Sequence, residues 1–329
     1  MIRYALRRLA GLLVLLLVLT AVVYGLFYAM PSNAAVLVCG KGCDGAQLAA
    51  VEHKLGLDQS VLAQYGHVLA GLVAGRDYSA GPDVTHCPAP CLGYSFKTDQ
   101  PVLSLIAQRL PVSLSLTAGA MVLWLLVGVG LGLVSSLREG RPVDRVVTVF
   151  VLAGQGTPVF VSGLVLLMVF CGWLRWLDFP VYVPLTEDPL AWARNLLLPW
   201  ITLAFLEAAI FARLTRTGML ETLAEDHIRT FRAYGLSEPA IVGRHAIRGA
   251  LIPLISLNAV EFGAVLVSAT LTETLFGLPG VGQLVAQSAN DVDLPVVAAL
   301  TLVAGVAVML ANTVADLLYA VADRRVTPA

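Results

Sequence analysis

The stretch Glu225–Pro253, EDHIRTFRAYGLSEPAIVGRHAIRGALIP, decides how this chain is organised. It is charged, helix-forming and interrupted by glycine, and it lies between long apolar runs. The chain has 329 residues, of which 58% are hydrophobic and 13% charged, and its mean hydropathy is +0.81. Soluble domains carry roughly 25% charged residues. The composition therefore predicts a protein that crosses a membrane several times, with Glu225–Pro253 exposed to water.

Six apolar segments are long enough to be membrane spans. Four contain no Asp, Glu, Lys or Arg, and the other two contain one acid each, Glu207 or Glu261. A helix needs about 20 apolar residues to cross a bilayer. We therefore predict an all-α integral membrane protein with six transmembrane helices. The segments are Leu9–Gly40, Leu110–Leu137, Val146–Leu174, Asn195–Ala212, Gly249–Thr272 and Pro295–Ala315.

The arginines predict the orientation of these helices. Most of them fall on one side of the membrane if the N-terminus is cytoplasmic, and positively charged loops stay inside. Both termini are then cytoplasmic in a cell inner membrane, and the first helix is expected to stay uncleaved. The predicted parts are an N-terminal helix at 1–30, an extracytoplasmic subdomain at 31–109, a transmembrane domain at 110–320 with a cytoplasmic loop at 213–249, and a tail at 321–329.

Four of the five cysteines lie in the external region, as the close pairs Cys39 with Cys43 and Cys87 with Cys91. An oxidising compartment favours disulfides, either within each pair or between the pairs. Four cysteines allow three connectivities, and the sequence does not choose among them. A zinc site is the alternative, because two to four residues commonly separate zinc ligands. The same region predicts a helix at Val61–Ala74 and a Gly/Pro-rich stretch after it.

Sequence motifs for catalysis are missing. The chain has no GxxxxGK[ST] phosphate loop, no HExxH zinc motif and no GxSxG nucleophile motif. We therefore predict no catalytic residue, no cofactor and no resident metal. The net charge of −1 gives no reason to expect nucleic acid as a partner. Work done by such a chain needs an external source of energy.

The start of the quoted stretch predicts a short helix with one apolar side. That side carries Ala224, Ile228, Phe231 and Gly235. Gly235 is expected to end the helix because glycine tolerates a positive φ. Ser237 can cap a second helix, which is expected to continue to Pro253 and into the fifth span. A push on the short helix would then move that span. An ordinary solvated loop is the alternative, since arginine-rich loops are common inside cells.

The quoted stretch resembles the cytoplasmic loop of permease subunits of ABC importers, in the dipeptide, oligopeptide and nickel branch. Four positions depart from the family pattern: His227, Phe231, Tyr234 and Gly249. Other segments resemble the same family, namely Leu55–Asp58, Gln108–Pro111, Thr272–Gly282 and Asn312–Tyr319. The matching residues of the loop are Glu225, Asp226, Ile228, Arg229, Thr230, Arg232, Ala233, Gly235, Leu236, Ser237, Arg244, His245, Ala246, Ile247, Arg248, Ala250, Leu251, Ile252 and Pro253.

The resemblance implies one half of a type I importer, embedded in membrane lipid. Its partners would be a homologous second permease in a heterodimer, two cytoplasmic ATPase subunits and an extracytoplasmic substrate-binding protein. Di- or oligopeptides are the expected cargo, and nickel, another metal chelate or a glycoside-like solute are alternatives. An ion-coupled secondary transporter is the alternative from another class. The residues expected to dock on the ATPase are Glu225, Asp226, Ile228, Arg229, Phe231, Arg232, Gly235 and Leu236.

Five further residues are candidates for the translocation pathway or a subunit interface. Acids are costly in lipid, so they should face the interior of the bundle or a water path. A purely structural role, as a hydrogen-bonding group between helices, is the alternative for them. The glycine-rich turn among these residues suits either a gate beside the pathway or a plain external turn. The five are Glu207, Glu261, Glu273, Pro279 and Gly280.

Overall fold

The computed structural model describes Gly11, Val14–Val23, Gly25, 44–45, 61–79, 84–95 and 97–322. Among these residues three helices are long and apolar enough to cross a membrane, and two bent pairs of helices pass the same test. The three are α5 (Val102–Leu137), α8 (Pro189–Ala224) and the Leu294–Ala315 part of α14 (Leu294–Ala322). The helical membrane fold is confirmed, and the count of six spans stays a prediction.

The chain forms two compact units, to which α5 and α14 both contribute. Unit 1 is Met1–Pro111 with Gly280–Met309, and unit 2 is Val112–Pro279 with Leu310–Ala329. Unit 1 also holds α4 (Val61–Ala74), four short strands and α13 (Val281–Asn290). The further helices of unit 2 are α6 (Pro142–Gly156), α7 (Val159–Leu166), the π-helix η1 (Leu167–Trp173), α9 (Asp226–Ala233), α10 (Glu238–Ile241), the π-helix η2 (Val242–Ala246), α11 (Ile247–Ser268) and α12 (Thr270–Phe276).

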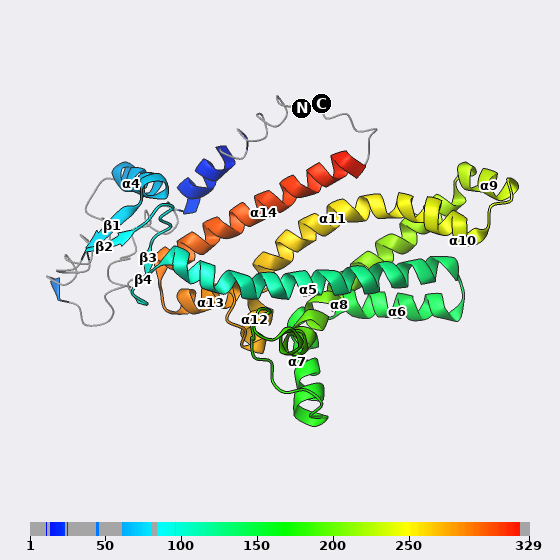
Figure 1. Ribbon diagram of the computed structural model, residues 1–329, viewed down its shortest axis with the longest axis horizontal. Helices are drawn as coiled ribbons and strands as arrows, with labels where there is room; N and C mark the ends of the chain where they lie inside the picture. The colour runs from blue at the N-terminus through cyan, green and yellow to red at the C-terminus, as the bar shows by residue number, and fades with distance from the viewer. Residues whose placement is uncertain are drawn as a thin grey trace. The chain divides into compact units, whose positions relative to one another are not determined.

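Helix α8 is the centre of unit 2. Helices α6, α7, α11 and α12 pack on it, and α5 runs alongside (Figure 1). Trp124 of α5 is fully buried, with its ring centroid 6.4 Å from that of Phe211 on α8. Gly128 lets the two helices approach closely, because a Cβ there would lie 2.7 Å from the Phe211 Cβ. Between helices in a bilayer, such close van der Waals packing is a main stabilising contribution, because lipid is as apolar as the protein core.

The predicted third span is broken in the middle. Helix α6 ends at Gly156, and the helix that begins at Val159 is bent from it by 106°. Pro158 causes the break, because proline has no N–H to donate and forces an extended conformation on the residue before it. That residue, Thr157, has φ −104° and ψ 119°. Farther along, buried Cys171 of η1 donates its Sγ–H to the carbonyl of Asp178, in line with a structural thiol.

Unit 1 contains the helix that the sequence predicts at Val61–Ala74, and its bounds are confirmed by α4. The Gly/Pro-rich stretch after it contains an antiparallel pair of strands, β1 (Arg76–Ser79) and β2 (Val84–Cys87). A second two-residue ladder joins β3 (Tyr94–Ser95) to β4 (Gln100–Pro101).

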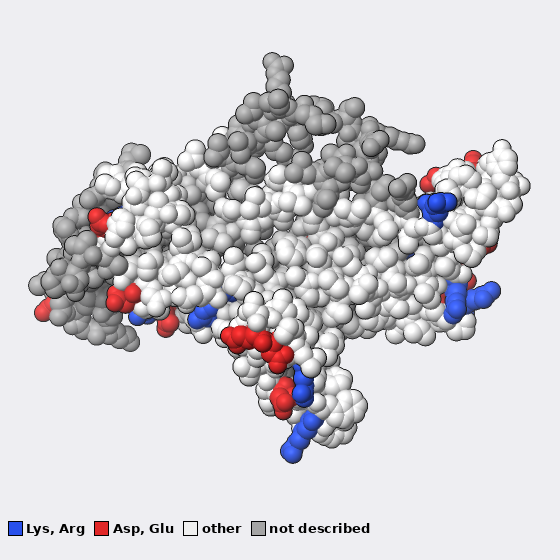
Figure 2. Space-filling model, in the orientation of Figure 1, with Lys and Arg blue, Asp and Glu red and all other residues white. Residues whose placement is uncertain are grey.

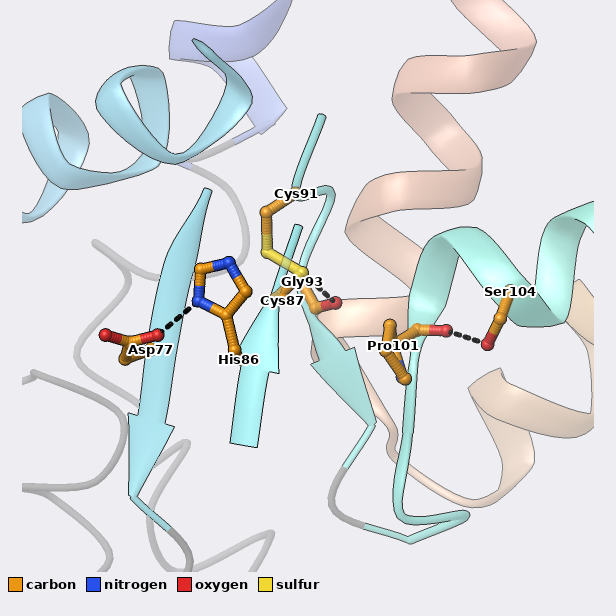
Figure 3. Close-up of a disulfide and its surroundings, with 7 residues drawn as sticks. All are labelled: Asp77, His86, Cys87, Cys91, Gly93, Pro101 and Ser104. Atoms are coloured by element: carbon orange, nitrogen blue, oxygen red, sulfur yellow. Dashed lines mark hydrogen bonds and ion pairs between the residues drawn. A yellow bond between two sulfur atoms is a disulfide. The ribbon is translucent and has the colours of Figure 1, made fainter. Parts of the chain in front are cut away.

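A disulfide joins Cys87 at the end of β2 to Cys91, so the predicted disulfide is confirmed for this pair and formed within it (Figure 3). Sulfurs bonded to each other do not ligate zinc, which removes the four-cysteine zinc alternative. Beside them the His86 Nδ1 lies 2.5 Å from the Asp77 Oδ1 across the hairpin. Cys39 and Cys43 lie outside the described residues.

Two polar contacts tie β3 and the turn after it to the turn before α14. Ser95 donates its hydroxyl to the Asp293 carboxylate, and the Lys97 ammonium donates to the Asp291 carbonyl. Asp293 is only 7% exposed, and this burial raises the pKa of its carboxyl above the ordinary value. The apolar core beneath contains Val102, Leu105, Ile106, Leu284, Val296, Ala299 and Leu300.

Candidate coupling site

The short helix predicted after α8 is confirmed as α9. Glu225 has an extended backbone that ends α8 and begins α9. Asp226 in the first turn and Arg232 in the last turn suit the helix dipole. Gly235 has φ +80°, and the Leu236 N–H donates to the Phe231 carbonyl to close the helix end. The predicted glycine break is therefore confirmed.

The apolar side of α9 faces the chain itself. Ile228 is completely buried, and α9 packs against α8 and α10. Phe231 is half-buried, with its ring centroid 4.2 Å from that of His245 in η2 and 5.8 Å from that of His227. Ile228 and Phe231 thus hold α9 in place, and Ile228 has no surface to offer a partner.

The outer side of α9 and the turn after it are exposed. Asp226 and Arg229 form an exposed ion pair of 3.3 Å, while Tyr234 is 79% and Leu236 37% exposed. Arg232 donates to Glu238 over 2.7 Å, and this hydrogen bond raises the pKa of Arg232. Figure 2 shows charged side chains around α9 and α10 and at the turn between α5 and α6, whereas the surface along α5 between its ends is uncharged.

The second predicted helix is confirmed: helical backbone runs from Glu238 into α11, includes a π-helical turn, and bends by 48° between Leu251 and Pro253. Ser237 occupies the position before α10, but its side chain makes no capping hydrogen bond. The helix then passes through η2 before α11 begins at Ile247. Met219 of α8 and Ala246 of η2 are both fully buried. Gly249 also lies close to α8, because a Cβ added to it would lie only 3.0 Å from the Thr222 Oγ1. This close packing fixes the start of α11 on the end of α8.

The sequence did not predict an ion pair that joins α8 to α6. Arg216 of α8 donates from Nε and Nη2 to the two carboxylate oxygens of Asp144 on α6, over 2.8 and 3.0 Å. The Ser135 hydroxyl and the Gly140 N–H also donate to Asp144. The pair joins residues 72 positions apart, so no local pattern could indicate it.

The candidate pathway acids lie inside unit 2. Glu207 on α8 is 7% exposed, and Glu261 on α11 is half-buried. Glu273 on α12 is completely buried and accepts a hydrogen bond of 2.6 Å from the Ser113 hydroxyl. Glu207 and Glu261 lie near enough for their charges to interact.

The predicted glycine-rich turn follows α12. Gly277 has φ +65° and ends the helix, and Leu278 after it is fully buried. Pro279 is exposed, and Gly280 occupies the position before α13. The geometry is that of a tight turn between two helices, and a role for Pro279 and Gly280 in gating stays a prediction.

These features define a helical, multi-pass membrane protein with an exposed helical segment fixed to two of its apolar helices. Residues 128–328 match the family described as "Binding-protein-dependent transport system inner membrane component", and residues 1–117 match its N-terminal counterpart. The chain belongs to this family of transporter permease subunits, which confirms the resemblance read from Glu225–Pro253.

Three curated relatives cover nearly the whole chain. The probable peptide ABC transporter permease protein y4tP of Sinorhizobium fredii is 32% identical, covering 98% of both chains. The putative peptide transport system permease protein BAB2_1050 of Brucella abortus is 33% identical, again covering 98% of both. The glutathione transport system permease protein GsiC of Escherichia coli O6:H1 is 32% identical, covering 97% of both.

A solved structure supports the fold. A chain of the inward-facing MetNI methionine ABC transporter superposes with a TM-score of 0.52 at 15% identity, covering 68% of this chain and 98% of that one. At this identity the likeness concerns the fold alone.

Proposed function

We propose that this chain forms half of the transmembrane pathway of an ATP-driven importer that carries di- or oligopeptides across the cytoplasmic membrane. A homologous second permease would complete the pathway, two cytoplasmic ATPase subunits would power it, and an extracytoplasmic binding protein would deliver the solute. The chain itself would have no catalytic site. Relatives named as peptide and glutathione permeases support peptides as the cargo.

The observation that carries the proposal is the position of α9. Its inner side is fixed through Ile228 and Phe231, while Tyr234 and Leu236 at its end are exposed. Exposed aromatic and aliphatic side chains beside arginines suit a protein partner, with charge steering the encounter. A force on α9 would pass directly to α8 and, through α10 and η2, to α11. We therefore assign ATPase docking to the exposed part of the segment and force transmission to the buried part.

The topology belongs to the same proposal. Residues 213–249 would be cytoplasmic, 31–109 extracytoplasmic and both termini inside. The disulfide between Cys87 and Cys91 supports this side for the hairpin, because disulfides persist in oxidising compartments. Alkylation of single cysteines by an impermeant reagent in intact cells tests the topology: a cysteine placed at Tyr234 should be protected, and one placed at exposed Val73 should react.

The test of function is uptake by the complete transporter in liposomes. A labelled tripeptide should accumulate only with ATP on the ATPase side and the binding protein on the other, and vanadate should stop it. Uptake that survives vanadate and follows an ion gradient would favour a secondary transporter. If nickel or a glycoside accumulated and the tripeptide did not, the proposed cargo would be wrong, but the proposed ATP-driven importer would still be supported.

Docking is tested separately by copurification. Tyr234→Asp should reduce recovery of the ATPase with the permease, because it places a charge on the exposed end of α9. Tyr234→Phe keeps the ring and serves as the matched control. Equal recovery with both variants would contradict docking at this surface.

A further inference from the structure

Glu207 is an unsatisfied carboxylate in an apolar core. It is 7% exposed, and its Oε2 has no hydrogen-bond partner. The residues on the same side of α8 belong to the apolar core of unit 2: Leu203, Ala204, Ala208 and Phe211. Burying an unpaired carboxylate costs several kcal/mol or forces it to take up a proton. A cation with N–H donors would offset that cost.

Glu261 supplies a second carboxylate beside the first. Helix α11 packs on α8, and Glu261 lies on the side of α11 that carries Leu254, Leu257 and Val265 into the same core. The two acids repel each other electrostatically. Neither forms an ion pair with a described Lys, Arg or His, and the partly buried Arg216 is already bound to Asp144. In the described part of the chain, the two carboxyl groups therefore have no basic side chain to neutralise a negative charge.

Glu261 is the more exposed of the two acids: it is half-buried, whereas Glu207 is almost completely buried. The pair is therefore accessible from the side of Glu261. A charge inside a span is expensive against lipid, so this side should face water or protein. In a half-transporter the water-filled surface is the translocation route. A group entering there would meet Glu261 first and Glu207 behind it.

We propose that Glu207 and Glu261 together bind a cationic group of the transported solute, of the size of an ammonium, such as the α-amino group of a peptide. This inference rests on the proposed function. It assigns to the permease a contribution to cargo selection, because neutral and acidic groups gain nothing from the two carboxylates. The ammonium would donate hydrogen bonds to both carboxylates during passage and leave when the helices move apart.

The experiment compares two solutes in the reconstituted complete transporter. They are trialanine with a free amino terminus and its N-acetylated, uncharged form, each measured with wild type and with the E207Q/E261Q variant. For each solute, uptake by the variant is divided by uptake by the wild type. The binding protein is the same in both measurements, so its preference for one solute cancels in this ratio. We expect this ratio to fall about tenfold or more for trialanine, as for a lost charge-assisted contact, and to stay near one for the acetylated peptide.

Glu221→Gln is the matched control, since Glu221 is an exposed acid on the same helix. Both solutes should move at wild-type rates with this variant. Equal losses for both solutes with E207Q/E261Q would overturn the inference and assign the pair a structural role, such as binding a basic residue of the second permease. Loss of ATP-dependent uptake in the wild type itself would instead contradict the proposed function.

A second measurement does not depend on uptake, so it also works if the binding protein does not bind the acetylated peptide. A membrane-permeant carbodiimide should label Glu261 in the wild-type transporter, read by mass spectrometry, and trialanine should slow the labelling several-fold. N-acetyl-trialanine and sodium chloride at the same concentration should not. If sodium chloride alone slowed the labelling, the two acids would bind a metal cation and not the ammonium group of the solute, which would overturn the inference.

Discussion

Arg216 and Asp144 form a two-bond ion pair between α8 and α6, with the Asp144 side chain 9% and the Arg216 side chain 31% exposed. The contact joins the turn between α5 and α6 to the helix that leads into α9. Removal of one partner from a pair this buried leaves a charge without compensation. Helices α5, α6 and α8 are thus held together at one point, since Ser135 of α5 also binds Asp144.

The first prediction concerns this pair. Arg216→Ala should lower the free energy of unfolding in detergent by about 3 kcal/mol. The double change D144A/R216A should cost less than the sum of the two single changes, because it leaves no unpaired charge. Arg213→Ala, an exposed arginine on the same helix, is the control and should shift the unfolding midpoint little. Additive costs in the double-mutant cycle would contradict the interaction.

The second prediction concerns the contact between α5 and α8. Gly128→Ala should destabilise unit 2 by about 1–3 kcal/mol, because the new Cβ would lie 2.7 Å from the Phe211 Cβ and 2.9 Å from the Ala208 carbonyl. Gly130→Ala, two residues along the same helix, has nothing within 4 Å of its Cβ and should be neutral or slightly stabilising. Thermal unfolding of the two purified variants makes the comparison. A Gly128 variant as stable as the Gly130 variant would show that the helices can separate without cost.

The third prediction concerns the turn after α9. Gly235→Val places a β-branched residue at φ +80°, which costs about 1–3 kcal/mol in backbone strain although the space around the Cβ is open. The strain should reorient Leu236 and reduce uptake per ATP hydrolysed, while the amount of protein in the membrane stays the same. Gly243→Val in η2 has open space and no positive φ, and it is the control. Unchanged coupling in Gly235→Val would argue against a fixed turn.

The fourth prediction concerns pH and unit 1. Burial raises the pKa of Asp293 above the value of about 3.9 expected in the unfolded chain. The folded state therefore binds more protons than the unfolded state between the two values, and stability increases as the pH falls through the raised pKa. Asp293→Asn is always neutral and should lack this gain.

Unfolding midpoints measured from neutral to mildly acidic pH should show wild type gaining stability relative to Asp293→Asn. Asp291→Asn, at an exposed neighbouring carboxylate, should change the slope much less. Parallel curves for wild type and Asp293→Asn would mean that the native and unfolded pKa values are the same.

Local signals in the sequence predict much of this fold. The helix at Val61–Ala74 is bounded by Gly75, and the end of α9 is set by Gly235; both glycines have a positive φ. The bend after Gly156 has an equally local cause in Pro158, although the length of the apolar run hides it. Charge-poor runs likewise predict α5, α8 and α14, because exclusion of charge is a property of each helix alone.

Contacts between distant residues could not be predicted in the same way. The pairs Asp144–Arg216 and Trp124–Asn258 are 72 and 134 positions apart, and each depends on which helices become neighbours. The apolar stripe of α9 illustrates the same limit. Periodicity places Ile228 and Phe231 on one side of the helix, but only the folded chain decides that this side covers η2 and α8.

The bend at Pro158 has a consequence for the lipid around the protein. The segment after it, α7 with 8 residues and η1 with 7, is at most about 22 Å long at roughly 1.5 Å per residue. The hydrocarbon layer is about 30 Å thick, so this arm is too short to cross it at normal thickness. Where lipid contacts such a short apolar arm, the bilayer has to thin beside it, which makes the arm sensitive to acyl-chain length. The thickness of the host membrane thereby becomes a physical variable for this transporter.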